Sequence, residues 1–428
     1  MSLRSSNKWY LLFVLTMVYA LNHVDRQVMV ILSEPIKQEF GLSDTQLGLL
    51  TGFLFAAFYA TLGIPFAMWA DRGNRRNIIA IALTIWSGMT ALSGFAGNFW
   101  HLALARMGVG IGEAGGTPPA TAMIADVFPP KRRALALGIY TTGISFGILI
   151  GFILGGAIAE KYGWRMGFFV AGVPGLFVAA LLLLTIAEPR RGQSENRMEE
   201  GDAPSLGETL SFFMSQRAMV SLLLGGVFVC VSANAFLVGI PLYLIRVHEV
   251  PIGELGIALG LLMGGLGGVG AIIIGGICDK LSEKDLRWRP WMILLTGIIA
   301  FPFIVWFLYA PNKSMAYWAY VVPGVVGLLY ASISYTAMQE LVPVRMRAMA
   351  SAVMLLCLTL IGIGFGPVIL GLISDYFNPT LGVKSIQRAL TIILVFNVLS
   401  IVFYIDAARH YRAGVAKALV EKDVVTPF

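Results

Sequence analysis

Long apolar stretches recur along almost the whole chain, and they restrict its fold more than any other feature of the sequence. A helix needs about 20 residues to cross the ~30 Å hydrocarbon core of a bilayer. Stretches of that length lie at 9–33, 46–70, 77–97, 101–126, 134–159, 166–187, 218–245, 255–278, 291–310, 317–339, 349–373 and 389–405. Because lipid offers no hydrogen-bond partner to a peptide group, each stretch must be helical. The sequence therefore predicts an all-α membrane protein with twelve transmembrane helices.

The composition agrees with this class of protein and excludes several others. Hydrophobic residues make up 57% of the chain and charged residues 13%, whereas soluble domains are about 25% charged. This balance excludes a disordered protein, a disulfide scaffold and almost any soluble enzyme of this length. Cys230, Cys278 and Cys357 lie in or beside apolar stretches and lack the spacing of metal ligands. We expect no metal site and no cofactor.

The distribution of Lys and Arg predicts the orientation of the chain in the membrane. Placing the N-terminus in the cytoplasm puts 22 of the 31 basic residues on the inner side, 7 in the outer loops and 2 inside spans. Cytoplasmic loops are the ones that carry an excess of Lys and Arg. We therefore expect both termini in the cytoplasm and, because tails and loops are short, a prokaryotic inner membrane. The same bias accounts for the net charge of +7 without a nucleic-acid partner.

One polar segment divides the chain into two halves. Residues 188–216 are rich in Glu, Arg, Gly and Ser, which is typical of a flexible linker. We predict a six-helix bundle at 1–187, a cytoplasmic linker at 188–217, and a second six-helix bundle with a short cytoplasmic tail at 218–428.

Charged motifs recur in both halves. An acid, two apolar residues, a proline and paired bases follow the fourth span at 126–133 and return after the tenth span at 340–347, an offset of 214 residues. The loop that begins at Asp71 matches the loop that begins at Asp279, at an offset of 208 residues. Two pseudo-symmetric halves around a linker are typical of a transporter that rocks about a central site.

The acid and base motifs after the second and eighth spans resemble those of the major facilitator superfamily. The string Arg106-Met-Gly-Val-Gly-Ile-Gly on the fourth span is similar to the arginine–glycine signature of that superfamily. Gly147, Gly151 and Gly155 on the fifth span resemble its glycine ladder. The resemblance covers nearly the whole chain and implies the major facilitator fold, with twelve helices in two pseudo-symmetric bundles.

A narrower resemblance involves the first and fourth spans. Asn22-His-Val-Asp-Arg and Gly112-Glu-Ala-Gly-Gly-Thr-Pro together resemble the spinster-like branch of that superfamily. Animal members of this branch move lysophospholipids and sphingoid-base phosphates. The resemblance therefore implies an amphipathic anionic substrate.

Four ionisable residues lie inside the spans, namely Asp25, Arg26, Arg106 and Glu113. A charge at the bilayer centre costs about 2.5–3.5 kcal/mol on insertion scales. These side chains must therefore face a polar cavity or pair with one another. Their depths along the two helices favour a pair between Asp25 and Arg106, with Arg26 between that pair and Glu113.

Our hypothesis is that Asp25 and Glu113 carry the protons that drive transport. Protonation of a carboxylate would free an arginine for an anionic substrate, and loss of the proton would return the arginine to its partner. Proton and substrate would then favour different states of the site, which is the physical basis of coupling. Alternatively, the four residues form static salt bridges that hold the first and fourth spans together.

Substrate contacts are expected from both halves. The expected residues are the polar and basic side chains of the central spans: Asn22, His23, Arg26, Arg106, Asn234 and Tyr335. The spans of the second half contain no central acid or base. A charged wall that faces an apolar wall suits a substrate with a polar head and a hydrocarbon body. Alternatively, hydroxyls such as that of Tyr335 only form hydrogen bonds between helices, and His23 is bonded within its bundle.

The inner loops are expected to close the cytoplasmic side. The expected gating residues are the acids and bases at the repeated positions: Asp71, Arg72, Arg75, Asp126, Arg133, Asp279, Lys280, Glu340, Arg345 and Arg347. Asp126 and Glu340 would serve as acid partners of the bases that follow them. Alternatively, the arginines only anchor the loops on the cytoplasmic side through their positive charge. This alternative does not account for the acids beside them.

Together these patterns predict a proton-coupled secondary transporter that works as a monomer by alternating access. The favoured substrate is an amphipathic anion such as a lysophospholipid. The alternative is a carrier of a small organic anion or a sugar that uses Arg26 and Arg106 to bind a carboxylate. A channel remains a further possibility, whereas a membrane enzyme lacks support because the sequence has no Gly-x-Ser-x-Gly or His-Glu-x-x-His motif.

Overall fold

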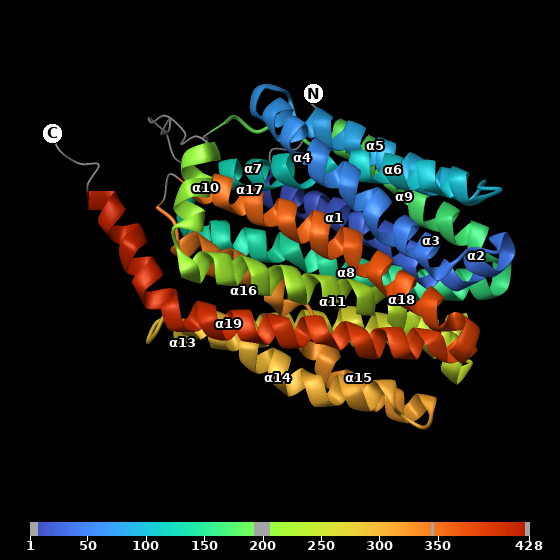
Figure 1. The fold of residues 1–428 in the computed structure, drawn as a ribbon. Helices are drawn as coiled ribbons and strands as arrows, with labels where there is room; N and C mark the ends of the chain where they lie inside the picture. Colours follow the sequence, from blue (N-terminus) through green and yellow to red (C-terminus); the bar gives the residue numbers. More distant parts are fainter. Residues whose placement is uncertain (1–6, 192–205, 344–345, 424–428) are drawn as a thin grey trace.

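The computed structural model describes residues 7–191, 206–343 and 346–423, and it is built from long helices (Figure 1). The helices up to the second half are α1 (Lys8–Ile31), α2 (Ser33–Phe40), α3 (Asp44–Gly48), η1 (Leu49–Phe53), α4 (Leu54–Arg72), α5 (Arg75–Ser93), α6 (Phe99–Ala114), α7 (Thr117–Val127), α8 (Pro130–Tyr162), α9 (Trp164–Thr185) and α10 (Leu206–Met214). Those of the second half are α11 (Arg217–His248), α12 (Ile252–Leu259), η2 (Gly260–Gly265), α13 (Leu266–Ser282), α14 (Trp288–Leu308), α15 (Lys313–Val326), α16 (Leu329–Glu340), α17 (Arg347–Cys357), η4 (Leu358–Phe365), α18 (Gly366–Leu381), η5 (Gly382–Lys384) and α19 (Ser385–Asp423).

Within the described residues, these helices form twelve passes in two bundles of six. The first bundle contains α1, α3–η1–α4, α5, α6–α7, α8 and α9, and the second contains α11, α12–η2–α13, α14, α15–α16, α17–η4–α18 and α19. Eight stretches of the described chain are long and apolar enough to cross a membrane by length and composition alone, and the last, 349–419, contains two passes. The pass formed by α1 is outside those eight because its central turns carry polar and charged residues.

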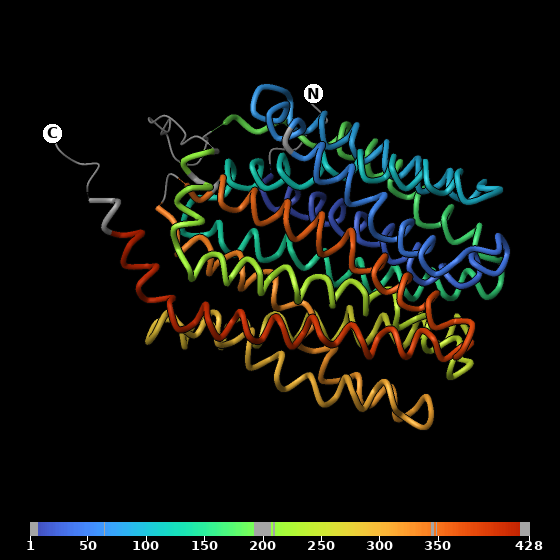
Figure 2. Tube along the Cα trace, viewed as in Figure 1, coloured from blue at the N-terminus to red at the C-terminus, as the bar shows by residue number. Residues whose placement is uncertain are grey.

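The two halves of the chain lie side by side along their length (Figure 2). The α8 helix packs against α12 and η2, and the α17–η4–α18 pass packs against α3, η1 and α4. The turns between α4 and α5, α7 and α8, and α13 and α14 lie at the same end as the C-terminus, which is called the termini end here (left in Figure 1). The end that carries α2 and α3 is called the far end.

Glycines let α1 and α8 approach each other closely. A Cβ atom at Gly147 of α8 would lie 2.4 Å from the carbonyl oxygen of Ala20, and one at Gly151 would lie 2.9 Å from Cβ of Gln27. Only a residue without a side chain fits such contacts, so α8 fixes the position and rotation of α1. This contact matters for function because α1 carries His23 and Gln27 on the side that faces α8 and the centre of the molecule.

The contact between the bundles also uses small residues. A Cβ atom at Gly256 of α12 would lie 2.4 Å from the carbonyl oxygen of Phe152, and one at Gly52 of η1 would lie 2.7 Å from the carbonyl oxygen of Gly364. The segments η1, η2 and η4 are π-helical, and each lies on a pass that contacts the other bundle. π-Helical turns inside α-helices are frequent at functional sites.

Two features at the termini end differ from the sequence expectation. The predicted linker at 188–217 contains the helix α10, whose Phe212 and Phe213 are buried against the second bundle; residues 192–205 are outside the described part. The last predicted span ended at 405, whereas α19 continues to Asp423. Its extension is anchored because the hydroxyl of Tyr411 lies within hydrogen-bond distance, 2.8 Å, of both the backbone oxygen of Ala337 and Oε2 of Glu340.

Candidate functional site

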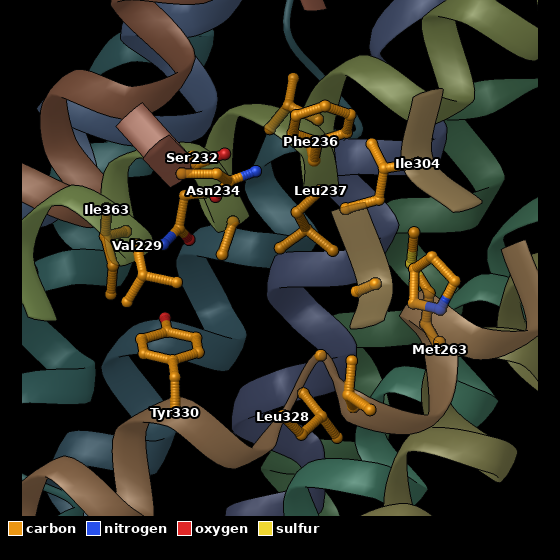
Figure 3. A pocket seen from close by; sticks show the side chains of 18 of the residues that line it. Val229, Ser232, Asn234, Phe236, Leu237, Met263, Ile304, Leu328, Tyr330 and Ile363 are labelled. Carbon is orange, nitrogen blue, oxygen red and sulfur yellow. The ribbon is translucent and has the colours of Figure 1, made fainter. Parts of the chain in front are cut away.

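A cavity of about 370 Å³ is lined by helices of both bundles. Its polar side chains from the first bundle are His23, Arg26, Gln27, Thr51 and Arg106. Those from the second bundle are Ser232, Asn234, Thr296, Tyr320, Tyr330, Asn397, Ser400 and Tyr404. Apolar groups such as Phe236, Leu237, Met263, Ile304 and Leu328 cover much of the second-bundle wall (Figure 3). Among the described residues, the wall contains two arginines and no carboxylate, so the cavity suits an anionic group beside an apolar one.

The α1 helix has two functional faces. His23, Arg26, Gln27 and Val30 line the cavity, and their spacing of three and four residues puts them on one side of the helix. Asp25 lies on the opposite side, and Asn22 lies one turn before Arg26 at the edge of the cavity face; both are buried and do not belong to the described cavity wall.

Arg26 joins the cavity to a buried carboxylate on α6. Its guanidinium contacts Oε2 of Glu113 through Nη2 at 2.6 Å and through Nε at 2.8 Å. The side chain of Glu113 is 0% exposed and that of Arg26 is 20% exposed. The guanidinium also lies 4.4 Å from the ring centroid of Phe55 and 5.2 Å from that of Tyr59. Arg26 therefore touches both the cavity and a carboxylate that is itself sealed from it.

Asp25 does not form the expected pair with Arg106. Neither oxygen of the Asp25 carboxylate has a hydrogen-bond partner in the described structure, although the residue is only 1% exposed. Arg106 instead donates a hydrogen bond from Nε to the backbone oxygen of Leu50 at 3.3 Å and lies 5.5 Å from the ring centroid of Phe55. The expectation rested on the similar depth of Asp25 and Arg106 in the membrane. The pair does not form because Asp25 is on the far side of α1 from the cavity. Arg26 is the residue that pairs with Glu113.

The remaining expected substrate contacts divide into two groups. His23 and Asn234 line the cavity, and Nδ1 of His23 lies 3.1 Å from the backbone oxygen of Tyr19. Asn22 is 4% exposed and Tyr335 is half-buried, and neither is part of the described cavity wall. Asn22 and Tyr335 thus do not line the cavity in this conformation, and their role as substrate contacts stays a prediction.

The expected gating residues form ties within each bundle. In the first bundle Arg75 pairs with Asp126, and its Nε lies 3.1 Å from Oε1 of Glu188. In the second bundle Arg289 pairs with Glu340 at 2.6 Å and with Asp279 at 3.1 Å. Sequence reasoning missed Glu188 and Arg289 as partners, although both stand beside predicted motifs.

The other expected gating residues mostly contact the backbone or solvent. Nη2 of Arg133 donates to the backbone oxygen of Ala125, and Nε of Arg347 donates to that of Gln339, both at 3.1 Å. The remaining exposed members at helix ends are Asp71, Arg72 and Lys280. Arg345 is outside the described residues.

A charged cluster at the far end ties the two bundles together, and the sequence analysis did not find it. Arg246 of α11 contacts Oε2 of Glu34 at 2.7 Å and Oδ2 of Asp44 at 2.8 Å. The Asp375 carboxylate of α18 accepts hydrogen bonds from the backbone nitrogens of Asp44 at 2.9 Å and Thr45 at 2.8 Å. Glu34, Asp44, Arg246 and Asp375, together with Lys37 and Ser374, are called the far-end latch below.

The described chain offers no obvious place for a metal ion. Within it, no group of three or more His, Cys, Asp or Glu side chains is arranged to hold one.

Comparison with known proteins identifies the family. The sequence model of the Major Facilitator Superfamily matches residues 12–367. The chain belongs to this superfamily. An MFS-type efflux pump of Mycolicibacterium smegmatis is 32% identical over 412 residues, which cover 96% of this chain and 95% of that protein. The sphingosine-1-phosphate transporter SPNS2 of Danio rerio is 25% identical, over 89% of this chain and 78% of that protein.

A solved structure agrees with this assignment. The crystal structure of a bacterial homologue of the human lysosomal transporter Spinster, in an inward-facing and unoccupied conformation, has a TM-score of 0.86 and is 33% identical. The match covers 96% of this chain and 99% of that one. The predicted fold class and the resemblance to the spinster-like branch are thereby confirmed. This member of the superfamily is a multi-pass membrane transporter and not an enzyme.

Proposed function

We propose that this transporter is proton-coupled, works by alternating access as a monomer, and carries an amphipathic anion such as a lysophospholipid. The observation that carries the proposal is Arg26, which lines the cavity while its guanidinium binds the sealed carboxylate of Glu113. One arginine can thus serve either an internal acid or a substrate anion, and the choice between them couples the two ligands.

Protons enter the proposal through the buried carboxylates. An ionised carboxylate that is buried without a partner is very costly, and such a group takes up a proton instead. Asp25 is in that situation, because neither of its oxygens has a hydrogen-bond partner. Protonation of Glu113 would remove the negative charge that holds Arg26, and Arg26 would then be available to an anionic head group in the cavity.

The chemistry of the cavity wall supports an amphipathic substrate. Arg26 and Arg106 supply positive charge from the first bundle, and Phe236, Leu237 and Ile304 supply an apolar surface from the second. One relative, SPNS2, is named as a transporter of sphingosine-1-phosphate, which is an anion with a hydrocarbon chain.

The far-end latch supports alternating access. It joins the bundles at the end opposite the termini, so opening at that end requires Arg246 to leave Glu34 and Asp44. We infer that 1–187 and 218–428 move as two rocking units, that the termini are cytoplasmic in an inner membrane, and that the cavity communicates with the cytoplasm in the conformation described here. The similarity to an inward-facing structure agrees with this state.

The test is transport by the purified chain in liposomes. A labelled lysophosphatidate should accumulate against its gradient when a pH difference is imposed. Glu113→Gln should abolish this accumulation while exchange of labelled for unlabelled substrate continues. Glu254→Gln, a change at an exposed carboxylate that pairs with Lys313, should behave as the unmodified chain.

Three results would contradict the proposal in different ways. Undiminished accumulation by Glu113→Gln would exclude the proton-coupling role of that residue. Stronger competition by a short dicarboxylate than by the lysolipid would favour the small organic anion. Flux that neither saturates nor shows exchange would indicate a channel.

A further inference from the structure

Several polar groups on the second-bundle wall of the cavity already have hydrogen-bond partners within their own bundle. Oγ of Ser400 donates to the backbone oxygen of Gly225 at 3.0 Å, and the hydroxyls of Tyr404 and Ser334 share a hydrogen bond of 2.8 Å. Oγ1 of Thr296 donates within its own helix to the backbone oxygen of Met292 at 2.9 Å. The hydroxyls of these residues are therefore used within the bundle and are less available to a substrate.

Asn234 on α11 is different, because only one side of its amide is used. Nδ2 donates to the backbone oxygen of Cys230 at 2.9 Å and to its Sγ at 3.3 Å. The backbone oxygen can only accept, so the nitrogen must face it and the orientation of the amide is fixed. The hydroxyl of Tyr330 donates to the same Sγ at 3.4 Å and packs this corner of the wall.

The side-chain oxygen of Asn234 is therefore held toward the cavity. It accepts no hydrogen bond from the described residues and is not among the enclosed polar atoms that lack a partner. Figure 3 shows Asn234 near Ser232, Val229 and Leu237, so apolar side chains and a hydroxyl surround it. A fixed acceptor in such a place gains from a hydrogen-bond donor and not from another anion.

We propose that Asn234 determines specificity by accepting a hydrogen bond from a hydroxyl or ammonium group that the substrate carries near its anionic head. The inference rests on the proposed function, in which Arg26 and Arg106 bind the anion from the opposite bundle. The preferred class is then a single-chain phosphate with a free hydroxyl or amine. A phosphate amphiphile without such a donor leaves the oxygen of Asn234 unpaired.

Two probes that differ only in the donor test this proposal. The first is 1-O-hexadecyl-glycerol 3-phosphate, which has a free hydroxyl at position 2, and the second is its 2-O-methyl ether. The unmodified chain should bind the hydroxyl probe about tenfold more tightly, as expected for one hydrogen bond of about 1.4 kcal/mol. Asn234→Leu should remove this preference by lowering the affinity for the hydroxyl probe to that for the ether.

The control is Thr336→Val, which removes a hydroxyl outside the cavity wall whose hydrogen bond is made within its own helix, to the backbone oxygen of Ser332 at 3.0 Å. It should keep the tenfold ratio between the probes. Binding of the ether by Asn234→Leu shows that this variant is folded. Equal affinity of the unmodified chain for both probes, or an equal loss for both in Asn234→Leu, would overturn the role of Asn234 while leaving the proposed function intact. If the unmodified chain binds neither probe, the proposed function fails as well.

Discussion

At the scale of single residues, the two buried carboxylates of the first bundle are not equivalent. Glu113 has a guanidinium as its partner, and Asp25 has no hydrogen-bond partner in the described structure. Breaking a buried ion pair leaves an uncompensated charge, whereas a buried carboxyl without a partner is protonated, so its neutral replacement uncovers no charge. The two residues should therefore respond differently to neutral substitution, although both are candidates for carrying protons.

The first prediction concerns the pair between Arg26 and Glu113. Arg26→Gln should lower the free energy of unfolding by about 3 kcal/mol, because it leaves the carboxylate of Glu113 buried without a cation. Thermal unfolding of the purified protein in detergent would measure the change. The double variant Arg26→Gln/Glu113→Gln should recover most of the loss. If the two single effects simply add in the double variant, the pair contributes no coupling energy and this account of it is wrong.

The second prediction concerns Asp25. Asp25→Asn keeps the shape of a carboxyl that is already protonated and neutral, so the unfolding temperature should stay the same or rise. Proton-driven accumulation should nevertheless be lost, because asparagine cannot carry a proton in this way. Both quantities can be measured on one preparation. A marked fall in unfolding temperature would mean that Asp25 is ionised and paired in the folded protein.

At the scale of helices, the packing of α8 on α1 positions the cavity face. The third prediction compares two glycines of α8. Gly147→Ala should destabilise the protein and weaken substrate binding, since the new Cβ would lie 2.4 Å from the backbone oxygen of Ala20 and 2.5 Å from Cβ of His23. Gly138→Ala has nothing within 4 Å and should be neutral or stabilising by up to about 1 kcal/mol.

The readout for these glycine variants is unfolding temperature together with substrate affinity. Gly138→Ala serves as the matched control on the same helix. Equal behaviour of the two variants would show that α8 has room to shift, and close packing would then not be what orients α1.

The fourth prediction concerns the extension of α19. Hydrogen bonds from Arg287 and then from Arg412 hold the pKa of the Asp285 carboxyl below its ordinary value. A carboxyl with a lowered pKa contributes stability above its unfolded pKa of about 4, and that contribution is lost only as the pH falls below this value. Attachment of the extension should therefore not change between pH 8 and pH 5.

Limited proteolysis of the extension checks this prediction. The cleavage rate, corrected for the pH dependence of the protease itself, should be equal at both pH values for the unmodified chain. Asp285→Asn should raise it at either pH because the tie to Arg412 is lost. Glu283→Gln, a change at an exposed acid in the same turn, should have no effect. A faster cleavage of the unmodified chain at pH 5 than at pH 8 would show that a group other than Asp285 anchors the extension.

At the scale of the whole molecule, the topology could be predicted from the sequence, but the contacts between the bundles could not. Twelve apolar stretches and two repeated motifs were enough to predict the fold, because each membrane span corresponds to one continuous apolar stretch of the sequence. Depth along the helices favoured a pair between Asp25 and Arg106, with Arg26 between that pair and Glu113, and the pair itself is absent. Depth could not choose between Asp25 and Arg26 as the cavity residue, since neighbouring residues differ by about 100° in direction and only packing against α8 fixes the rotation of α1.

The far-end latch was beyond sequence reasoning for a different reason. Its charges stand at the ends of spans, where single charges are ordinary and need no partner. Arg246 and Glu34 are separated by 212 residues in the chain, and they meet only because the bundles close at that end. A contact between distant residues that forms in one conformation produces no pattern in the neighbouring sequence. The sequence therefore shows these residues as charges but does not show their partners.

The last prediction is that the latch sets the balance between the two conformations. Asp375 receives hydrogen bonds from the backbone nitrogens of Asp44 and Thr45, at the first turn of α3 in the other bundle. Helix starts need such acceptors, and this one is lost when the far end opens. Arg246→Gln and Asp375→Asn should therefore each favour opening at the far end, with a tenfold change in the open population for every 1.4 kcal/mol removed.

Spin labels on cysteines substituted for Tyr162 and Tyr376, with the native cysteines replaced by serine, report this opening, because both positions are exposed and belong to different bundles. A longer distance should gain population in both latch variants. Lys313→Ala provides the control, since it breaks an ion pair with Glu254 that lies within one bundle at the same end. If that control opens the far end as much as Arg246→Gln does, general loss of surface charge is responsible, and the contacts between bundles do not hold the closed state.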